Sequence, residues 1–506
     1  MKRPGGTAIV VIAFRFVGNT LLGAERLTPA VSAYLNRPLD FAQLQAAVSA
    51  IATAYREAGW VVRAYLPEQD IVDGIVTIRI VEAVFGGVRH EGQKPSRVPL
   101  EDIVRLFDVQ QKTGEPLNAN AIDRALLLAE DMPGVTVSGS LRKGANEGES
   151  ELALKVADTP ILSGESALDD TGSRSTGRVR LAVNLALESP LGFGEKVSLN
   201  GVHSQGSDYL LIGGNAPLGA DGWRVGASSS HMTYKLVAPE MVALKGQGSS
   251  NTLALNAIYP VIRSRLNNLY FNASLDHKAF DNLSMEEVTT RYKIDSLTLG
   301  LNGNLLDRLG GGGANSASAS LVNGNVNLDG SPNQAAVATT TRTAGRFSKF
   351  QFSASRQQVI SSNLAFYASL SGQIAGKNLD SSEKFYLGGS SGVRAYPVSE
   401  AGGSEGKLVS LELRWRLPEG FSLTGFFDYG QVTVNRNNNF TGASALNSLS
   451  LRGAGMTLAR YSASGFGIKG TLAQRIGNNP NPTATGNDQD GSLIKNRVWL
   501  SASLPF

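Results

Sequence analysis

The spacing of hydrophobic residues divides the chain into two regions that meet near residue 160. Before this point, some segments repeat apolar residues every three or four positions and others at every second position, which predicts a mixture of helices and strands. After Pro160 the helical spacing disappears and alternation with period two remains. The pattern therefore predicts α+β modules followed by an all-β domain.

The first region repeats one order of elements: strand, helix, helix, strand, strand. In its first half, a strand at Ala13–Gly18 precedes a longer helix at Asp40–Ala58, which Asp40 can cap. Its second half shows the same order, with helices at Leu100–Phe107 and Asn118–Glu130. A repeat of this size indicates two separate modules, which we place at residues 1–86 and 87–158.

The second region, residues 159–506, contains about sixteen alternating segments. An even number of strands about ten residues long is typical of a closed outer-membrane barrel. Lipid requires apolar side chains outside, a wet lumen accepts polar ones inside, and closure leaves no unpaired backbone group in hydrocarbon. We therefore predict a 16-stranded antiparallel transmembrane barrel, with strands near 161–171, 175–189, 195–204, 207–216, 223–236, 249–261, 265–280, 289–306, 313–328, 345–359, 363–377, 406–418, 421–435, 447–461, 465–477 and 497–506.

The connections between these segments alternate in length. Tight turns such as Pro190–Gly194 and Pro418–Gly420 alternate with longer polar connections such as Asn435–Asn447 and Asn478–Ser492. Short periplasmic turns and long outer loops are usual in outer-membrane barrels. The alternative is a large soluble β-sandwich or solenoid, for which a regular alternation of loop length has no physical reason.

One long connection, residues 378–405, combines apolar and aromatic residues with an arginine. Arg394 lies beside Val393 and close to Tyr396, a setting that suits burial, and a buried arginine requires a carboxylate partner. Asp428 lies on the polar face of a later strand. Two interpretations remain open: Arg394 pairs with Asp428 in the lumen, or it binds a backbone carbonyl or solvent at the barrel mouth.

Composition narrows the classes of function. Among 506 residues, 42% are hydrophobic and 18% are charged, so disorder is excluded, and no apolar run reaches the about 20 residues that a membrane-spanning helix needs. A net charge of +4 gives no reason to expect nucleic acid as a partner. With no cysteine and four scattered histidines, the chain offers no thiolate site and little for a metal cluster. It also lacks nucleotide-binding and hydrolase motifs, so neither an enzyme nor a cofactor is predicted.

The first residues share only the charge order of a signal peptide. Met1–Arg3 is basic and Thr7–Phe14 is apolar, but a small-residue cleavage site is lacking and Arg15 interrupts the run. We expect a first strand at Ile9–Val17 instead. If the protein is exported, we expect its natural start to lie upstream of this chain.

Several motifs are similar to those of two-partner secretion transporters of the haemolysin secretion/activation type. That family belongs to a superfamily with polypeptide-transport-associated (POTRA) domains before a sixteen-stranded barrel. Val393-Arg394-Ala395-Tyr396 resembles its Val-Arg-Gly-Tyr loop motif, and Phe426, Asp428 and Gly430 resemble its Phe-x-Asp-x-Gly strand motif. Further similarities are the barrel start, Asp169-Asp170-Thr171-Gly172 with Thr176-Gly177, and the terminal Phe506, which fits recognition during barrel assembly.

Two positions depart from the family pattern. Ala395 stands where the loop motif has glycine, and Gly403-Ser404-Glu405-Gly406 only approximates a Gly-Asp-x-Gly sequence, so the fine geometry of the loop is expected to differ. The plug helix and linker that precede the first POTRA domain in the family are not found in this chain.

The resemblance implies export of one large exoprotein, such as an adhesin or haemolysin, across the outer membrane. The POTRA domains would capture the unfolded N-terminal secretion domain of the exoprotein by strand addition, and the barrel would form the pore. Arg394 and Asp428 would hold the loop in the lumen. The implied partners are the exoprotein, outer-membrane lipid and the barrel-assembly machinery, and no nucleotide, nucleic acid, metal or cofactor is implied.

Two other functions remain open. An insertase that assembles other outer-membrane barrels shares the loop and strand motifs, although relatives with that function usually carry more periplasmic modules. A passive porin or a surface adhesin would have no use for the two N-terminal modules.

Overall fold

The computed structural model describes residues 8–506, so the basic residues Met1–Arg3 lie outside the described part of the chain. The described residues form two compact units: residues 8–159 together with the turn 219–222, and the remainder. Within residues 8–506, no helix is long and apolar enough to cross a membrane.

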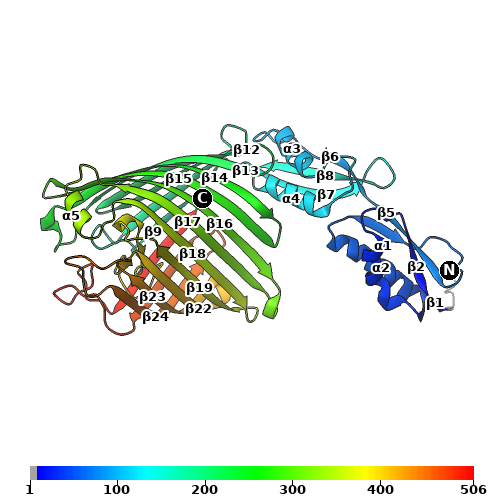
Figure 1. Cartoon of the computed structure of the whole chain (residues 1–506). Helices are drawn as coiled ribbons and strands as arrows, with labels where there is room; N and C mark the ends of the chain where they lie inside the picture. Colours follow the sequence, from blue (N-terminus) through cyan, green and yellow to red (C-terminus); the bar gives the residue numbers. More distant parts are fainter. Residues whose placement is uncertain (1–7) are drawn as a thin grey trace. The chain divides into compact units, whose positions relative to one another are not determined.

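The first module combines a three-stranded sheet with two helices (Figure 1). The strand order is β2 (Ala13–Val17), β5 (Ile75–Glu82), β4 (Val62–Tyr65), and buried residues of β5 and the helices form the core. The expected strand at Ile9–Val17 is divided, because β1 (Ile9–Val11) pairs instead with β3 (Arg37–Leu39). The helical elements are α1 (Ala24–Val31), the 3-10 helix η1 (Ser32–Tyr34) and α2 (Phe41–Glu57). Helix α2 begins at a capping box, in which the side chains of Asp40 and Gln43 each accept a hydrogen bond from the other's backbone N–H.

A partly buried carboxylate fastens the segment after β2 to this core. Glu82 accepts hydrogen bonds from the backbone N–H groups of Thr20 and Leu21 and from the Tyr55 hydroxyl, all at 2.8 Å. Burial alone would raise the pKa of Glu82, but these bonds outweigh it and hold the pKa below its usual value. The ionised form of Glu82 therefore stabilises the first module.

The second module repeats the architecture of the first. Its sheet has the order β6 (Val84–His90), β8 (Glu149–Asp158), β7 (Val135–Lys143). Helices α3 (Leu100–Gln110) and α4 (Ala119–Glu130) share a buried core with the sheet. The boundary expected at 86/87 falls inside β6. A backbone hydrogen bond from Leu117 N to Ala83 O, 2.7 Å long, is one of several that join the end of the first module to the second.

Sixteen antiparallel strands form a closed barrel, as the alternating pattern predicts (Figure 1). Each strand coincides with one expected segment, with bounds that shift by a few residues. They are β9 (Leu162–Asp169), β10 (Arg180–Glu188), β11 (Lys196–Ser204), β12 (Ser207–Leu218), β13 (Trp223–Lys235), β14 (Gln247–Arg263), β15 (Asn267–Ser284), β16 (Glu287–Asp307), β17 (Gly313–Asn327), β18 (Gly345–Val359), β19 (Leu364–Ala375), β22 (Glu405–Arg416), β23 (Phe421–Thr433), β24 (Ser448–Tyr461), β25 (Gly467–Arg475) and β26 (Asn496–Pro505).

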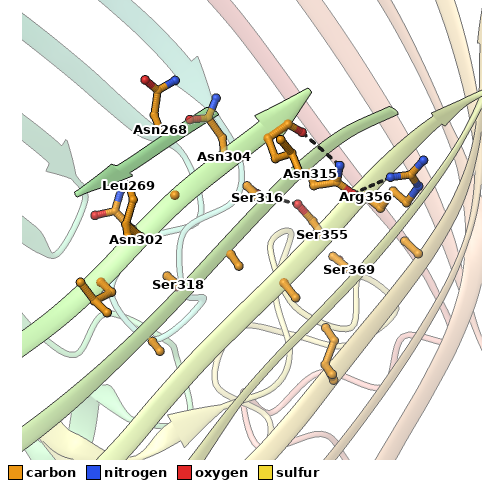
Figure 2. A pocket seen from close by; sticks show the side chains of 18 of the residues that line it. Asn268, Leu269, Asn302, Asn304, Asn315, Ser316, Ser318, Ser355, Arg356 and Ser369 are labelled. Carbon is orange, nitrogen blue, oxygen red and sulfur yellow. Dashed lines mark hydrogen bonds between the residues drawn. The ribbon is translucent and has the colours of Figure 1, made fainter. Parts of the chain in front are cut away.

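The two faces of the barrel wall differ in polarity. On β16, Leu297, Leu299 and Leu301 are all exposed on the outward face, as a lipid-facing surface requires. On the inward face, Ser316 of β17 and Ser355 of β18 form a hydrogen bond of 2.8 Å across the two strands, which Figure 2 shows. Small polar side chains therefore line this part of the lumen.

The connections distinguish the two ends of the barrel. We call the end where the chain enters β9 the near end and the opposite end the far end. The longest connections lie at the far end, where residues 328–344 include a short helix, α5 (Gln334–Thr339). Two far-end connections, 205–206 and 285–286, are only two residues long, so the expectation of long loops throughout this end was wrong. The first joins strands that pair regularly up to the turn, whereas the second follows a register shift between Asn282 and Leu283.

The seam between the first and last strands is short. β26 and β9 share five register pairs, from Ser501 with Asp169 to Pro505 with Glu165, whereas β9 and β10 share eight. Gly164 and Phe506 exchange two backbone hydrogen bonds of 2.9 Å at one end of the seam. At the other end, the Asp170 carboxylate accepts a hydrogen bond from Leu500 N at 2.8 Å, which extends the pairing by a side chain.

Candidate functional site

The far-end connection between β19 and β22, residues 376–404, folds back into the lumen, and we call it the pore loop. Its two limbs pair through the short strands β20 (Phe385–Tyr386) and β21 (Gly402–Gly403). Residues 387–401, between these strands, carry Arg394 and the rest of the loop motif. The limbs therefore form a paired stem, and the motif lies at its inner end.

Arg394 is held on the lumen wall by two carboxylates. Its Nε and Nη2 donate to the two oxygens of Asp428 at 2.8 and 2.7 Å, and its Nη1 lies 2.9 Å from Glu412 Oε1. Asp428 is 0% exposed and also accepts hydrogen bonds from Arg394 N and the Ser410 hydroxyl. The structure thus brings Arg394 and Asp428 together inside the lumen, rather than leaving Arg394 at the mouth.

Two further contacts hold Arg394 on the wall. Its Cζ lies 3.5 Å from the centroid of the Phe426 ring, a cation–π contact. The indole Nε1 of Trp499 donates to the carbonyl oxygen of Arg394 at 2.8 Å. Strands β22, β23 and β26 therefore all contact one loop residue. Removing one partner of a buried pair leaves the other charge uncompensated. Loss of any one charged partner is therefore expected to weaken the attachment of the loop to the wall.

Apolar packing holds the rest of the motif against the wall. The buried loop residues and the buried residues of β23, β24 and β25 form one hydrophobic cluster beside the ion pairs. The cluster consists of Leu387, Val393, Ala395, Tyr396 and Ala401 from the loop and Phe426, Val432, Leu449, Leu451 and Ala473 from the wall.

Two wall glycines make room for this packing. A Cβ on Gly430 would lie 2.5 Å from a methyl carbon of Leu387, and a Cβ on Gly453 would lie 2.5 Å from the Cβ of Ala395. Ala395 does not have a positive φ, so the alanine in place of the motif glycine introduces no backbone strain. The departure from the family motif is therefore accommodated by the space at Gly453.

An ionic network connects the pore loop to the far-end connection between β25 and β26, residues 476–495. Asp488 is 0% exposed and pairs with Arg475 and Arg497, at 2.6 and 3.2 Å. From the pore loop, Glu400 accepts hydrogen bonds from Gln489 N at 2.9 Å and from the Asn479 side chain. These contacts join the tips of two far-end connections.

Glu400 lies outside the membrane-spanning strands and has a perturbed acidity. Burial raises the pKa of Glu400 to about 7. The neighbouring carboxylates of Asp488 and Asp490 add to the rise, whereas the hydrogen bonds from Asn479 and Gln489 oppose it. The charge of Glu400 is therefore expected to change near neutral pH.

Between the pore loop and the near end, the lumen contains a cavity of about 630 Å³. Ser390 and Arg394 of the loop line it, together with Glu412, Arg414 and Lys469 of the wall. The loop therefore separates this cavity from the far end of the lumen.

Three residues of this site, Glu412, Ser410 and Trp499, were not predicted from the sequence. Ser410 and Glu412 did carry a signal, because they alternate on the polar face of one strand. Strand pairing places Ser410 directly opposite Asp428, which brings Ser410 and Glu412 close to the Arg394 site. This register cannot be read from the sequence. Phe506 belongs to the seam of the barrel and not to this site.

Comparison with known proteins gives two matches to family models. Residues 148–458 match the model described as haemolysin secretion/activation protein ShlB/FhaC/HecB. Residues 9–83 match the model of the ShlB-type POTRA domain. Together the matches extend over the first module and most of the barrel.

Individual relatives cover most of the chain. The chain is 27% identical over 493 residues to the heme/hemopexin transporter protein HuxB of Haemophilus influenzae, covering 95% of this chain and 84% of HuxB. It is 25% identical over 433 residues to the outer membrane transporter CdiB of Dickeya dadantii, covering 81% of this chain and 73% of that protein. The solved structure of CdiB from Escherichia coli is similar in fold, with a TM-score of 0.75 at 20% identity over 99% of this chain and 91% of that structure.

Proposed function

The chain belongs to the haemolysin secretion/activation family, and on that premise we propose that it carries a large secreted exoprotein across the outer membrane by two-partner secretion. The barrel lies in the outer membrane, and the N-terminal POTRA region lies in the periplasm. The near end of the barrel is thus periplasmic and the far end faces the outside. One observation carries the proposal: a closed barrel of sixteen strands whose lumen holds a loop fastened by buried ion pairs.

We assign substrate capture to residues 1–86 and 87–158, acting as two POTRA domains. In the described part of each sheet, β2 and β7 pair with one strand only, which leaves a sheet edge. An unfolded segment from the N-terminal secretion domain of the exoprotein would add to such an edge as a further strand. Main-chain hydrogen bonds would supply affinity, and side-chain pockets would supply selectivity.

Passage through the lumen requires the pore loop to move. Residues 387–401 stand above the cavity of about 630 Å³, in the path of an extended polypeptide. Release of Arg394 from Asp428 and Glu412 would free this segment. Folding of the exoprotein outside the cell supplies the direction of transport, so transport requires no nucleotide.

Two further partners follow from the barrel. Lipid contacts the outward leucines of the wall. The barrel-assembly machinery would recognise the C-terminal strand, which ends at Phe506 and closes the seam.

A secretion assay tests the proposal. Cells that lack their own copy of the transporter receive this chain behind a secretory signal peptide, together with its exoprotein, and the exoprotein in the medium is measured. We expect secretion with the wild type, a strong loss with Arg394→Ala, and little change with Arg356→Ala, whose partner Asp307 lies elsewhere on the wall. Barrel assembly is checked by the shift in gel migration on heating. Failure of the wild type to export exoprotein would contradict the function, and full secretion by Arg394→Ala would contradict the role of the loop.

A further inference from the structure

The first limb of the pore loop contains a buried carboxylate that takes no part in the contacts of Arg394. Glu383 is 4% exposed and ends the 3-10 helix η4 (Ser381–Glu383). Lys278 of β15 and Lys349 of β18 each place Nζ 2.8 Å from a different oxygen of this carboxylate. Lys349 is itself buried and donates a further hydrogen bond to the Glu383 carbonyl oxygen at 3.0 Å.

Gln373 of β19 connects both limbs of the loop at this point. Its Nε2 donates to the carbonyl oxygens of Glu383 in the first limb and Ser404 in the second, both at 3.0 Å. Gln351 of β18 donates to the Oε1 of Gln373 at 2.9 Å, which fixes the orientation of the amide. The β20–β21 pairing starts just beyond these contacts. Both limbs therefore leave the wall as one fastened stem, which we call the root of the loop.

We call the contacts of Arg394 with Asp428, Glu412, Phe426 and Trp499 the Arg394 lock. The charged contacts of the root and those of the Arg394 lock lie on different parts of the wall. Charged and polar contacts of the root come from β15, β18 and β19, and Leu379 adds apolar packing against Tyr292 and Phe347 on the same side. Arg394 contacts β22, β23 and β26. The stem strands β20 and β21 also touch β22 and β23, but the charged partners of Glu383 and of Arg394 lie on separate strands, so loss of one set of ion pairs leaves the other set in place.

We propose that Glu383 is the positioning residue of a hinge, so that release of Arg394 frees residues 387–401 while the root stays fastened to the wall. Opening is then a swing of the loop tip about the paired stem, and not withdrawal of the whole loop. The inference rests on the proposed function only in taking this loop as the part that clears the lumen. The fastening itself needs no exoprotein.

Spin labels at the root and the tip separate these two motions. The chain has no cysteine, so a single introduced cysteine gives one labelling site. Ser382 and Ser391 are both exposed and report on the root and the tip, respectively. The full chain is reconstituted in phospholipid vesicles without exoprotein, and label mobility is read from the electron paramagnetic resonance spectrum. A failure of secretion in cells leaves this measurement unaffected.

Each variant has a distinct expected result. Arg394→Ala makes the Ser391 label mobile and leaves the Ser382 label immobile. Glu383→Gln leaves two lysines beside a neutral side chain, and the mobile fraction at Ser382 rises about tenfold or more, because a buried charge has lost its partner. The exchange of charges in Glu383→Lys with Lys349→Glu restores the immobile spectrum. Asp307→Asn, which breaks a pair elsewhere on the wall, changes neither label.

Two outcomes would overturn the hinge. One is a Ser382 label that Arg394→Ala mobilises as much as the Ser391 label, since the loop would then leave as a whole. The other is a Ser382 label that stays immobile in Glu383→Gln. Gel migration before and after heating confirms in each case that the barrel is closed, so that a misfolded variant is not read as an opened loop.

Discussion

Replacing Asp428 by asparagine tests the Arg394 lock with the smallest change in shape. The two oxygens of Asp428 accept four hydrogen bonds, three from Arg394 and one from Ser410. Asparagine keeps one oxygen, but its amide NH₂ then faces buried donors and the negative charge is lost. Breaking a buried pair costs about 3–5 kcal/mol. Because Glu412 and the Phe426 ring still contact Arg394, we take the lower value, which raises the population of the released loop about a hundredfold.

Single-channel recording in planar bilayers measures this population, because a released loop appears as open events. The matched control is Asp307→Asn, since Asp307 pairs with Arg356, which Figure 2 shows beside Asn315 on the barrel wall. That pair is partly exposed and screened by solvent, so its loss is expected to change the position of the pore loop little. We expect open events to become about a hundredfold more frequent in Asp428→Asn and to change little in the control. Equal frequencies in the two variants would refute the reasoning.

Three further changes test other parts of the molecule. Gly430→Ala places a methyl group against the packed loop and destabilises its closed position by about 1–3 kcal/mol, whereas Gly425→Ala on the same strand, where a Cβ meets nothing within 4 Å, leaves channel recordings unchanged. Glu82→Gln lowers the stability of the first module. Because the pKa of Glu82 is lowered in the folded state, the wild type loses the same stabilisation as the pH falls through that folded pKa. Hydrogen exchange of the full chain measures both effects. Because the pKa of Glu400 is raised to about 7, its protonation stabilises the contacts between the pore loop and residues 476–495. A spin label at Thr485 is therefore more mobile above this pH than below it. Glu400→Gln removes the difference.

Each of these expectations has a result that contradicts it. Identical recordings from the two glycine variants would show that the loop does not need the space at Gly430. Unchanged protection of the segment around Thr20 in Glu82→Gln would show that the carboxylate does not fasten it. A label at Thr485 that responds to pH equally with and without Glu400 would assign the titration to another group.

The barrel could be predicted from the sequence because each strand faces lipid on one side and water on the other. Lipid on one side and water on the other impose alternation over every crossing segment, and β18 was predicted with its observed bounds of 345 and 359. The repeated modules were predicted for a similar reason, since caps such as Asp40 and Asn118 mark helix starts locally.

The site was predictable only where a residue stands out against its surroundings. Arg394 did so, because a charged residue in an apolar loop needs a partner. Glu383 did not, because the lysine that meets it from β15 is 105 positions away along the chain. Such pairs depend on which strands face the loop, and a single sequence gives no local sign of that.

The short seam has a consequence for how the protein reaches its membrane. β9 and β26 are the first and last strands of the barrel, so none of their shared hydrogen bonds can form until the C-terminal residues have been synthesised and delivered. Before that, the sheet is open and presents two rows of unsatisfied backbone groups, which hydrocarbon does not tolerate. Insertion and cyclisation of the sheet must therefore be completed together, and removing the last few residues would leave a ribbon that cannot enter the bilayer.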